Sequence, residues 1–204
     1  MISTAALVAG GLSLLAAFAL SVLLTPVVRR WAIHRDFVDR PGQLSHKRHT
    51  RPISLGGGMA ITLAILVPMA GGLIVATVLH RLGPGHLLYL TTRVPLWHDY
   101  VGGVLLKMPQ ALAIIAGALF MHLVGIMDDH RPMSAWAKLI LQFGVAIVLA
   151  AGFGVRSGDA LGKTTAVILT VLWIVTIINA FNFMDNMDGL TSGVAAIAAV
   201  ILAV

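Results

Sequence analysis

Two short polar stretches stand between long apolar runs of the sequence. Residues 124–142 read VGIMDDHRPMSAWAKLILQ, and residues 179–190 read NAFNFMDNMDGL. Clustered carboxylates without a fixed countercharge suit a hard divalent cation that prefers oxygen ligands, such as Mg²⁺ or Mn²⁺. Because Mg²⁺ commonly binds one or two carboxylates together with substrate phosphates, the stretches predict chemistry on phosphorylated substrates. The carboxylates in question are Asp128, Asp129, Asp185 and Asp188.

The adjacent pair Asp128–Asp129 is predicted to lie where an apolar helix ends, and Ser134 is a suitable N-cap for the next helix. Neighbouring helical residues point about 100° apart, so the two carboxylates are not equivalent. One can face a metal or substrate while the other supports it. A polar helix terminus is the structural alternative. However, two acids at a helix C-terminus oppose the helix dipole by ~0.3–1 kcal/mol each, which favours a functional role.

In the second stretch, Asn179, Asn182, Asp185 and Asp188 recur every three residues. This spacing drifts by about 60° per step on an ideal helix, so neighbouring members can share a face but all four cannot. We predict a helix whose last turn carries the two asparagines, followed by a tight turn through 185–189. Turn formation explains the Asn, Asp and Gly residues of that turn. It does not explain two amides inside an apolar run, where each needs a partner.

A third stretch, residues 36–58, combines acidic and basic residues with the glycine run Gly56–Gly58. It could lie on anionic headgroups, with ~1 kcal/mol gained per basic residue. Alternatively, it gathers phosphate, and the glycines allow close backbone approach where the next helix starts. The candidate phosphate donors are Lys47, Arg48 and Arg51. A zinc site is disfavoured because no acidic or Cys partner has ligand spacing to the three histidines, His34, His46 and His49.

Membrane-spanning helices must position these stretches. The chain has 204 residues, of which 58% are hydrophobic and 11% charged, too few polar residues for a soluble domain of this length. Each crossing needs about 20 mainly apolar residues. The predicted fold is therefore all-α, a polytopic transmembrane helix bundle formed by one domain, 1–204. Its predicted spans lie near 5–28, 56–79, 109–127, 135–153, 164–182 and 190–204.

The basic residues predict which loops face the cytoplasm. Seven of the fourteen Lys and Arg residues lie within 29–51, directly after the first span, and such loops stay inside. If each run crosses once, the N-terminus is external and the loops 29–55, 128–134 and 183–189 are cytoplasmic. Six of the eight acidic residues then share this face, which predicts a site there: Asp36, Asp39, Asp128, Asp129, Asp185 and Asp188.

Other classes of protein fit less well. The net charge of +6 could indicate nucleic-acid binding, but the basic residues gather beside a span, so topology explains them and no nucleic-acid partner is predicted. The first run is too long for a signal peptide and lacks a basic n-region. A transporter would place polar groups near the middle of its spans, whereas here they gather at one face.

Three motifs resemble those of the polyprenyl-phosphate N-acetylhexosamine-1-phosphate transferases, the glycosyltransferase family 4 group. The first, D-x-P…H-x-x-P-x-x-x-GGG, begins at Asp39; the second, G-x-x-DD…KL-x-x-Q, begins at Gly125. The third, N-x-x-N-x-x-D-x-x-DGL, begins at Asn179. The last two are specific and the first is looser, and together they cover essentially the whole chain.

This resemblance implies transfer of N-acetylhexosamine 1-phosphate from a UDP-sugar to undecaprenyl phosphate, with release of UMP. The implied cofactor is Mg²⁺, with Mn²⁺ as an alternative, and the implied metal ligands are Asp128, Asp129 and Asp185. The implied catalytic residues are these three and Asp188. The candidate substrate-binding residues are Asn179, Asn182, Lys47, Arg48, His49, Arg51 and Lys138.

The implied setting is the bacterial inner membrane, with the active site facing the cytoplasm and a homodimer as a candidate assembly. Asn186 stands where many members have Gly, as in variants nearer the O-antigen enzymes of lipopolysaccharide synthesis. The interval between Pro41 and His49 is two residues longer than in the family motif, which leaves the alignment of Lys47 open. Members of the family continue for several more spans, with a later Asp motif and a His-rich loop. We therefore expect an N-terminal fragment that lacks part of its active site. The alternatives are a non-catalytic homologue or assembly partner and, less favoured, a transporter.

Overall fold

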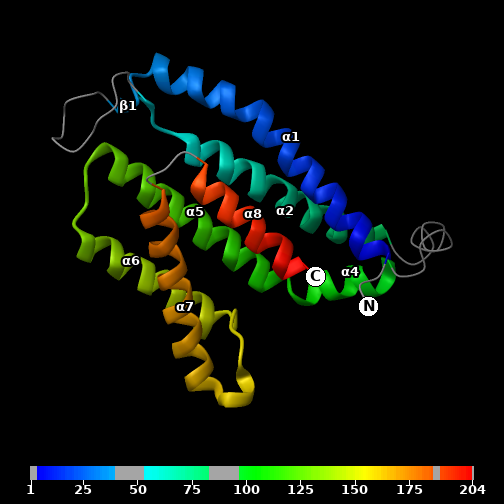
Figure 1. Cartoon of the computed structure of the whole chain (residues 1–204). Coiled ribbons are helices and arrows are strands. Elements are labelled where there is room, and N and C mark those ends of the chain that lie inside the picture. The colour runs from blue at the N-terminus through cyan, green and yellow to red at the C-terminus, as the bar shows by residue number, and fades with distance from the viewer. Residues whose placement is uncertain (1–3, 40–52, 83–96, 186–188, 204) are drawn as a thin grey trace. The chain divides into compact units, whose positions relative to one another are not determined.

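The computed structural model describes residues 4–39, 53–82, 97–185 and 189–203 (Figure 1). Helices dominate these residues, and the only strands among them are the two-residue β1 (Val38–Asp39) and β2 (Ile53–Ser54), which pair antiparallel. The predicted all-α fold is therefore confirmed. The α-helices are α1 (Thr4–His34), α2 (Gly57–Leu82), α4 (Trp97–Leu106), α5 (Met108–His130), α6 (Ala135–Ile147), α7 (Lys163–Met184) and α8 (Leu190–Ala203).

Five helical segments of the described residues are long and apolar enough to cross a membrane, and a shorter apolar helix follows at Leu190–Ile201. Large apolar side chains such as Leu12, Phe18 and Ile61 are exposed along these helices. A water-facing helix would not carry such surfaces, whereas a lipid-facing helix requires them. The predicted polytopic bundle is confirmed at this level, and the direction of each crossing stays a prediction.

The ends of two helices are set by recognisable local features. α1 continues through Arg29 and Arg30 to His34, past the predicted span end at residue 28, because neither Gly nor Pro follows Pro26 until Pro41. α5 ends at His130, and Arg131 adopts an extended conformation (φ −141°, ψ 103°). The residue before a proline disfavours the helical conformation, so Pro132 explains this end.

Helix α4 was not predicted as an element. It lies between the predicted spans 56–79 and 109–127. With ten residues it is too short to be recognised as a crossing.

The chain divides into two compact units, Met1–Pro132 and Met133–Val204. In the first unit, α2 packs along α1 and also contacts α4 and α5. The residues buried on α2 are mostly alanines, Ala60, Ala64 and Ala76. Small residues at such seams allow helices to approach closely, which is the usual packing device in membranes.

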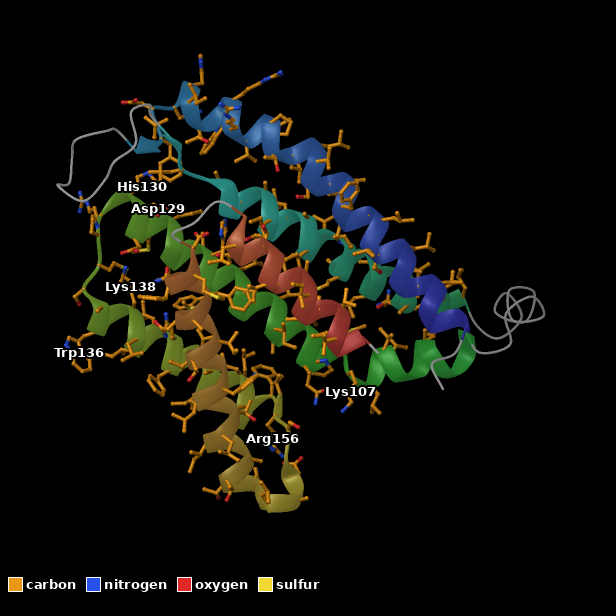
Figure 2. All side chains as sticks on the ribbon, in the orientation of Figure 1. Lys107, Asp129, His130, Trp136, Lys138 and Arg156 are labelled. Carbon is orange, nitrogen blue, oxygen red and sulfur yellow. The ribbon has the colours of Figure 1, made fainter. Side chains whose placement is uncertain are left out.

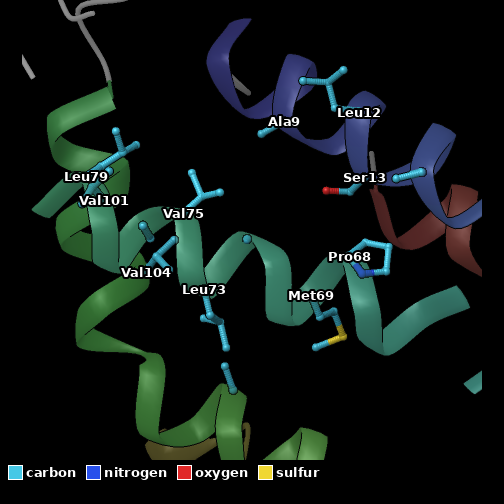
Figure 3. A pocket seen from close by; sticks show the side chains of 14 residues that line it. Ala9, Leu12, Ser13, Pro68, Met69, Leu73, Val75, Leu79, Val101 and Val104 are labelled. Atoms are coloured by element: carbon cyan, nitrogen blue, oxygen red, sulfur yellow. The ribbon is translucent and has the colours of Figure 1, made fainter. Parts of the chain in front are cut away.

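The first unit also contains an apolar cavity of about 550 Å³ lined by residues of α1, α2 and α4 (Figure 3), and by Ala111 of α5. Leu12 and Ser13 line it from α1, and Pro68 and Val75 line it from α2. None of the predicted site residues that the structure describes lines this cavity.

In the second unit, α6 and α7 form an antiparallel pair joined by residues 153–162 (Figure 1). α6 continues as the π-helical turn Val148–Gly152. The buried cluster consists of Ala146 of α6, Ala150 of the π-helical turn, and Val171 and Val175 of α7. Both pairs are spaced by four residues, so each lies along one face of its helix.

Candidate functional site

The last turn of α5 carries the predicted acidic pair. Asp128 is half-buried and Asp129 is exposed, so the two carboxylates have different surroundings, as expected for neighbouring helical residues. His130 follows them directly at the same end of α5 (Figure 2). Its Nδ1 donates a hydrogen bond to the carbonyl oxygen of Ile126 at 2.9 Å, which holds the ring against its own helix.

The His130 ring stacks on Phe37, which lies just after α1. The ring centroids are 4.7 Å apart and the planes are inclined by 20°. An aromatic pair of this kind contributes ~0.5–1.5 kcal/mol beyond its buried area. Two acids at a helix C-terminus cost ~0.3–1 kcal/mol each. The stack is therefore large enough to offset much of the cost of placing Asp128 and Asp129 there.

Phe37 is itself held on several sides. Its amide donates to the carbonyl oxygen of Ala32 at 2.8 Å, and its carbonyl oxygen accepts from the amide of Leu55 at 3.1 Å. Its ring meets Trp31 edge to face, with centroids 6.5 Å apart. The preceding residue, Asp36, has a φ of 55°, which is uncommon for a residue other than Gly and turns the chain sharply out of α1.

The glycine run at the start of α2 lies against this arrangement. Gly56 has a φ of 117°, and a Cβ there would stand 2.9 Å from Met59 Cε and 3.8 Å from Phe37 Cδ1. A Cβ on Gly58 would lie 3.7 Å from the His122 ring of α5. Among the described residues, the glycines thus allow the start of α2 to approach Phe37 and α5 closely.

The basic stretch, the part of residues 36–58 that carries the candidate phosphate donors, begins and ends beside the C-terminal end of α5. In the short strand pair, Val38 pairs with Ser54 and Asp39 with Ile53, and Phe37 directly precedes β1. The stretch therefore leaves and rejoins the described chain next to the residue that stacks on His130. Its candidate phosphate donors lie outside the described residues, so their roles stay predictions: Lys47, Arg48, His49 and Arg51.

The second acidic stretch follows α7, which ends at Met184. Asp185 is the exposed C-cap, and its amide donates to the carbonyl oxygen of Phe181 at 3.1 Å. Asn182 is exposed in the last helical turn. Gly189, with a φ of 77°, precedes α8, as expected for a turn, whereas Asn186 and Asp188 lie outside the described residues.

Asn179 has a structural partner that the sequence analysis did not identify. Its Nδ2 donates to Gln142 Oε1 at 2.6 Å and to the carbonyl oxygen of Val175 at 2.8 Å. Both amide hydrogens are thereby used between α6 and α7 and within α7. Gln142 is only 6% exposed. The partner that an amide needs inside a span is thus another amide, and Asn179 holds two helices together whatever else it does. The signal for Gln142 was available, since it too is an amide in an apolar run.

The same hydrogen bond places Lys138 near the acidic end of α7. Because α6 and α7 are antiparallel, Lys138 lies about 6 Å beyond Gln142 along the pair, whereas Asn182 and Asp185 lie about 4.5 and 9 Å beyond Asn179 in the same direction. Lys138 is half-buried on α6 (Figure 2). The second unit thus brings three predicted site residues to one end of its helix pair.

The sequence was also compared with those of known proteins and families. Residues 111–204 match the family model described as glycosyl transferase family 4. A curated relative, the probable undecaprenyl-phosphate N-acetylglucosaminyl 1-phosphate transferase of Bacillus subtilis (strain 168), is 30% identical over 163 residues. The chain belongs to glycosyl transferase family 4. The resemblance inferred from the motifs is therefore confirmed.

The family 4 match contains both acidic stretches and excludes residues 36–58, which agrees with the looser fit of the first motif. The alignment to the Bacillus relative covers 76% of this chain and 36% of the relative, so the chain spans about a third of the length of that protein. No solved structure matches the chain.

The metal ligands expected for a family 4 protein are distributed over both units. Asp128 and Asp129 belong to the first unit and Asp185 to the second, so their meeting at one site stays a prediction. Within the part of the chain that is described, no group of three or more His, Cys, Asp or Glu side chains could hold a metal ion. The paired carboxylates of α5 are hard oxygen donors of the kind that Mg²⁺ shares with phosphate and water.

Proposed function

We propose that the full-length protein transfers N-acetylhexosamine 1-phosphate from a UDP-sugar to undecaprenyl phosphate. UMP is released, and the product is a lipid-linked diphosphate sugar for cell-envelope polysaccharide synthesis, such as that of O-antigen. The observation that carries this proposal is the family 4 match, which includes both acidic stretches. The name of the Bacillus relative, an undecaprenyl-phosphate N-acetylglucosaminyl 1-phosphate transferase, supports the acceptor and the class of sugar.

The chemistry requires little proton transfer from the protein. A phosphate oxygen of the lipid attacks the β-phosphorus of the UDP-sugar, and the bond between that phosphorus and the bridging oxygen of UMP breaks. A phosphate monoester has a second pKa of about 6, so the attacking group is largely ionised at neutral pH. Catalysis then depends mainly on positioning and on neutralising the charge of the phosphates.

Asp128, Asp129 and Asp185 are the proposed holders of Mg²⁺, or of Mn²⁺ in its place. The ion would supply positive charge to the diphosphate. Asp128 and Asp129 fit this role because they are oxygen donors on one helix end, and Mg²⁺ needs only one or two carboxylates when phosphates complete its shell. Asp188 is proposed to act with them. The proposed contacts to substrate come from Lys138, Asn179 and Asn182, and from the basic stretch through Lys47, Arg48, His49 and Arg51.

The proposed setting is the bacterial inner membrane, with the N-terminus outside and the acidic helix ends in the cytoplasm. A nucleotide sugar is a cytosolic compound and the acceptor is a membrane lipid, so the site must face the cytoplasm at the bilayer surface. The excess of basic residues between residues 29 and 51 supports this orientation. A homodimer is the proposed assembly.

The test is release of UMP by the purified full-length protein, supplied with undecaprenyl phosphate and a panel of UDP-N-acetyl sugars. Activity should require Mg²⁺ and disappear with a chelator. Asp128→Asn and Asp185→Asn should each lower turnover by roughly 100-fold or more, the scale seen when a charge-stabilising group is removed, without a change in Tm.

Asp159→Asn is the matched control, because Asp159 is 64% exposed and pairs only locally with Arg156. Unchanged turnover in both of the Asp128 and Asp185 variants would refute the assignment. The sugar that supports the highest kcat/KM identifies the donor.

A further inference from the structure

The end of α5 would be a poor platform for catalytic carboxylates if it stood alone. The last carbonyl groups of a helix lack partners within it, and helix ends fray. Two acids at this end also oppose the helix dipole. Because Arg131 is already extended, the directions of the Asp128 and Asp129 side chains depend in part on what holds the backbone of the last turn.

Two contacts of His130 help to hold that turn. His130 is fastened to α5 through the bond from Nδ1 to the Ile126 carbonyl oxygen, and its ring is covered by Phe37. Phe37 is fastened in turn to the end of α1 through the Ala32 carbonyl oxygen and to the approach of α2 through the Leu55 amide. The ring stack therefore links α5 to two other elements of the first unit, one residue away from the acidic pair.

We propose that Phe37 and His130 are positioning residues that fix the last turn of α5 and so set the directions of Asp128 and Asp129. We call this pair the ring clamp. Its consequence for catalysis rests on the proposed function, because misplacing a catalytic group by 1 Å can cost about 100-fold in rate. Its consequence for the structure does not.

The geometry separates a clamp from a chemical role for His130. The Nδ1 proton is already donated to Ile126, and one face of the ring is occupied by Phe37. A clamp depends mainly on a flat ring at position 130, to which the nitrogen adds only the bond to the Ile126 carbonyl oxygen, so a ring without nitrogen should keep most of the effect. A residue that acts on substrate needs the nitrogen.

The experiment compares two disruptive and two conservative variants of the full-length protein. Phe37→Ala and His130→Ala remove one ring, whereas Phe37→Tyr and His130→Phe keep the stack. The first readout is hydrogen exchange of the Arg131 amide, which donates to the Met127 carbonyl oxygen at 2.8 Å in the last turn. The second readout is kcat/KM for UMP release.

We expect both alanine variants to speed exchange at Arg131 and to lower kcat/KM by about tenfold, equivalent to about 1.4 kcal/mol. The two conservative variants should restore both readouts to within about threefold of wild type. Phe120→Ala is the matched control, since Phe120 is also on α5, is 44% exposed and has no ring partner among the described residues. It should change neither readout.

Several results would overturn the clamp. If His130→Ala left the exchange at Arg131 unchanged, the last turn would not need the stack. This comparison does not depend on whether Phe37→Ala folds, because His130 is exposed and its replacement should leave the fold intact. A His130→Phe variant as impaired in turnover as His130→Ala would show that the nitrogen matters. Faster exchange with undiminished kcat/KM would show that the carboxylates are not positioned by it. If the wild-type protein released no UMP, the proposed function would fail while exchange still decided the structural part.

Discussion

The hydrogen bond between Asn179 and Gln142 offers a quantitative test of how the second unit is held together. We predict that Asn179→Leu destabilises the protein more than Gln142→Leu, because it leaves the buried Gln142 amide without its partner, whereas Asn179 is exposed and keeps its bond to the Val175 carbonyl oxygen. The cost of a buried polar group that loses its partner is ~1–3 kcal/mol. The bond is short, at 2.6 Å, and Gln142 is 6% exposed, so solvent cannot readily replace Asn179 as the partner of Gln142.

The double variant should cost much less than the sum of the two. When both polar partners are replaced by apolar groups of similar size, the change can be nearly neutral. Interhelical hydrogen bonds in membranes show coupling energies of about 0.6 kcal/mol on average and up to about 1.7 kcal/mol. The bond is part-buried, so we expect a coupling within this range, about 0.6–1.7 kcal/mol.

The assay is a double-mutant cycle on the free energy of unfolding, measured in mixed micelles with a denaturing detergent. Thr77→Val is the matched control, because the Thr77 hydroxyl donates to the Leu73 carbonyl oxygen at 2.7 Å within its own helix. Combined with Gln142→Leu it should be additive within about 0.5 kcal/mol, since the two sites share no partner. A coupling of zero between Gln142 and Asn179 would refute the pairing, and the Asn179 side-chain amide would then not be held by α6.

Three further predictions concern local geometry and orientation. Ser134→Ala should lower the free energy of unfolding by about 1 kcal/mol, because the Ser134 hydroxyl accepts from a first-turn amide of α6 at 3.2 Å; Ser134→Asp should retain the stability, and an equal loss in both would argue against capping. Gly189→Ala should lower the free energy of unfolding by ~1–2 kcal/mol because the φ of Gly189 is 77°, whereas Gly193→Ala in α8 should raise it by about 0.5–1 kcal/mol. Among the described residues no heavy atom lies within 4 Å of either added Cβ, so equal effects on unfolding would contradict the role of φ. Since the sequence contains no Cys, Ser157→Cys should react with an impermeant maleimide in intact cells and Arg131→Cys only after permeabilisation, and the reverse pattern would invert the proposed topology.

Sequence reasoning performed well where one residue determines the outcome. Ser134 was predicted as the N-cap of the next helix, and its side chain caps the start of α6, which is a local effect. The apolar runs predicted the helices because each must exceed about 20 residues to cross a bilayer. The acidic pair was placed at a helix end for the same reasons, and the structure has it in the last turn of α5.

The sequence could not reveal pairs that form across long separations. Phe37 and His130 are far apart in the chain, and periodicity says which face a residue occupies but not which ring it meets. The apolar run around Asn179 predicts that its amide needs a partner, yet a substrate and another side chain satisfy an amide equally well. Only the spatial neighbourhood of α6 and α7 identifies Gln142 as that partner.

The antiparallel pairing of α6 and α7 also determines where the chain can accept foreign sequence. The register is set by side chains on the helices, from Gln142 with Asn179 to the buried alanines and valines, and not by the connection 153–162. A single residue inserted between Gln142 and Ala146 would rotate one against the other by about 100° and separate the amides. An epitope tag or a small reporter placed in the connection would leave the register intact, which makes this hairpin the natural attachment point for following the protein in living cells.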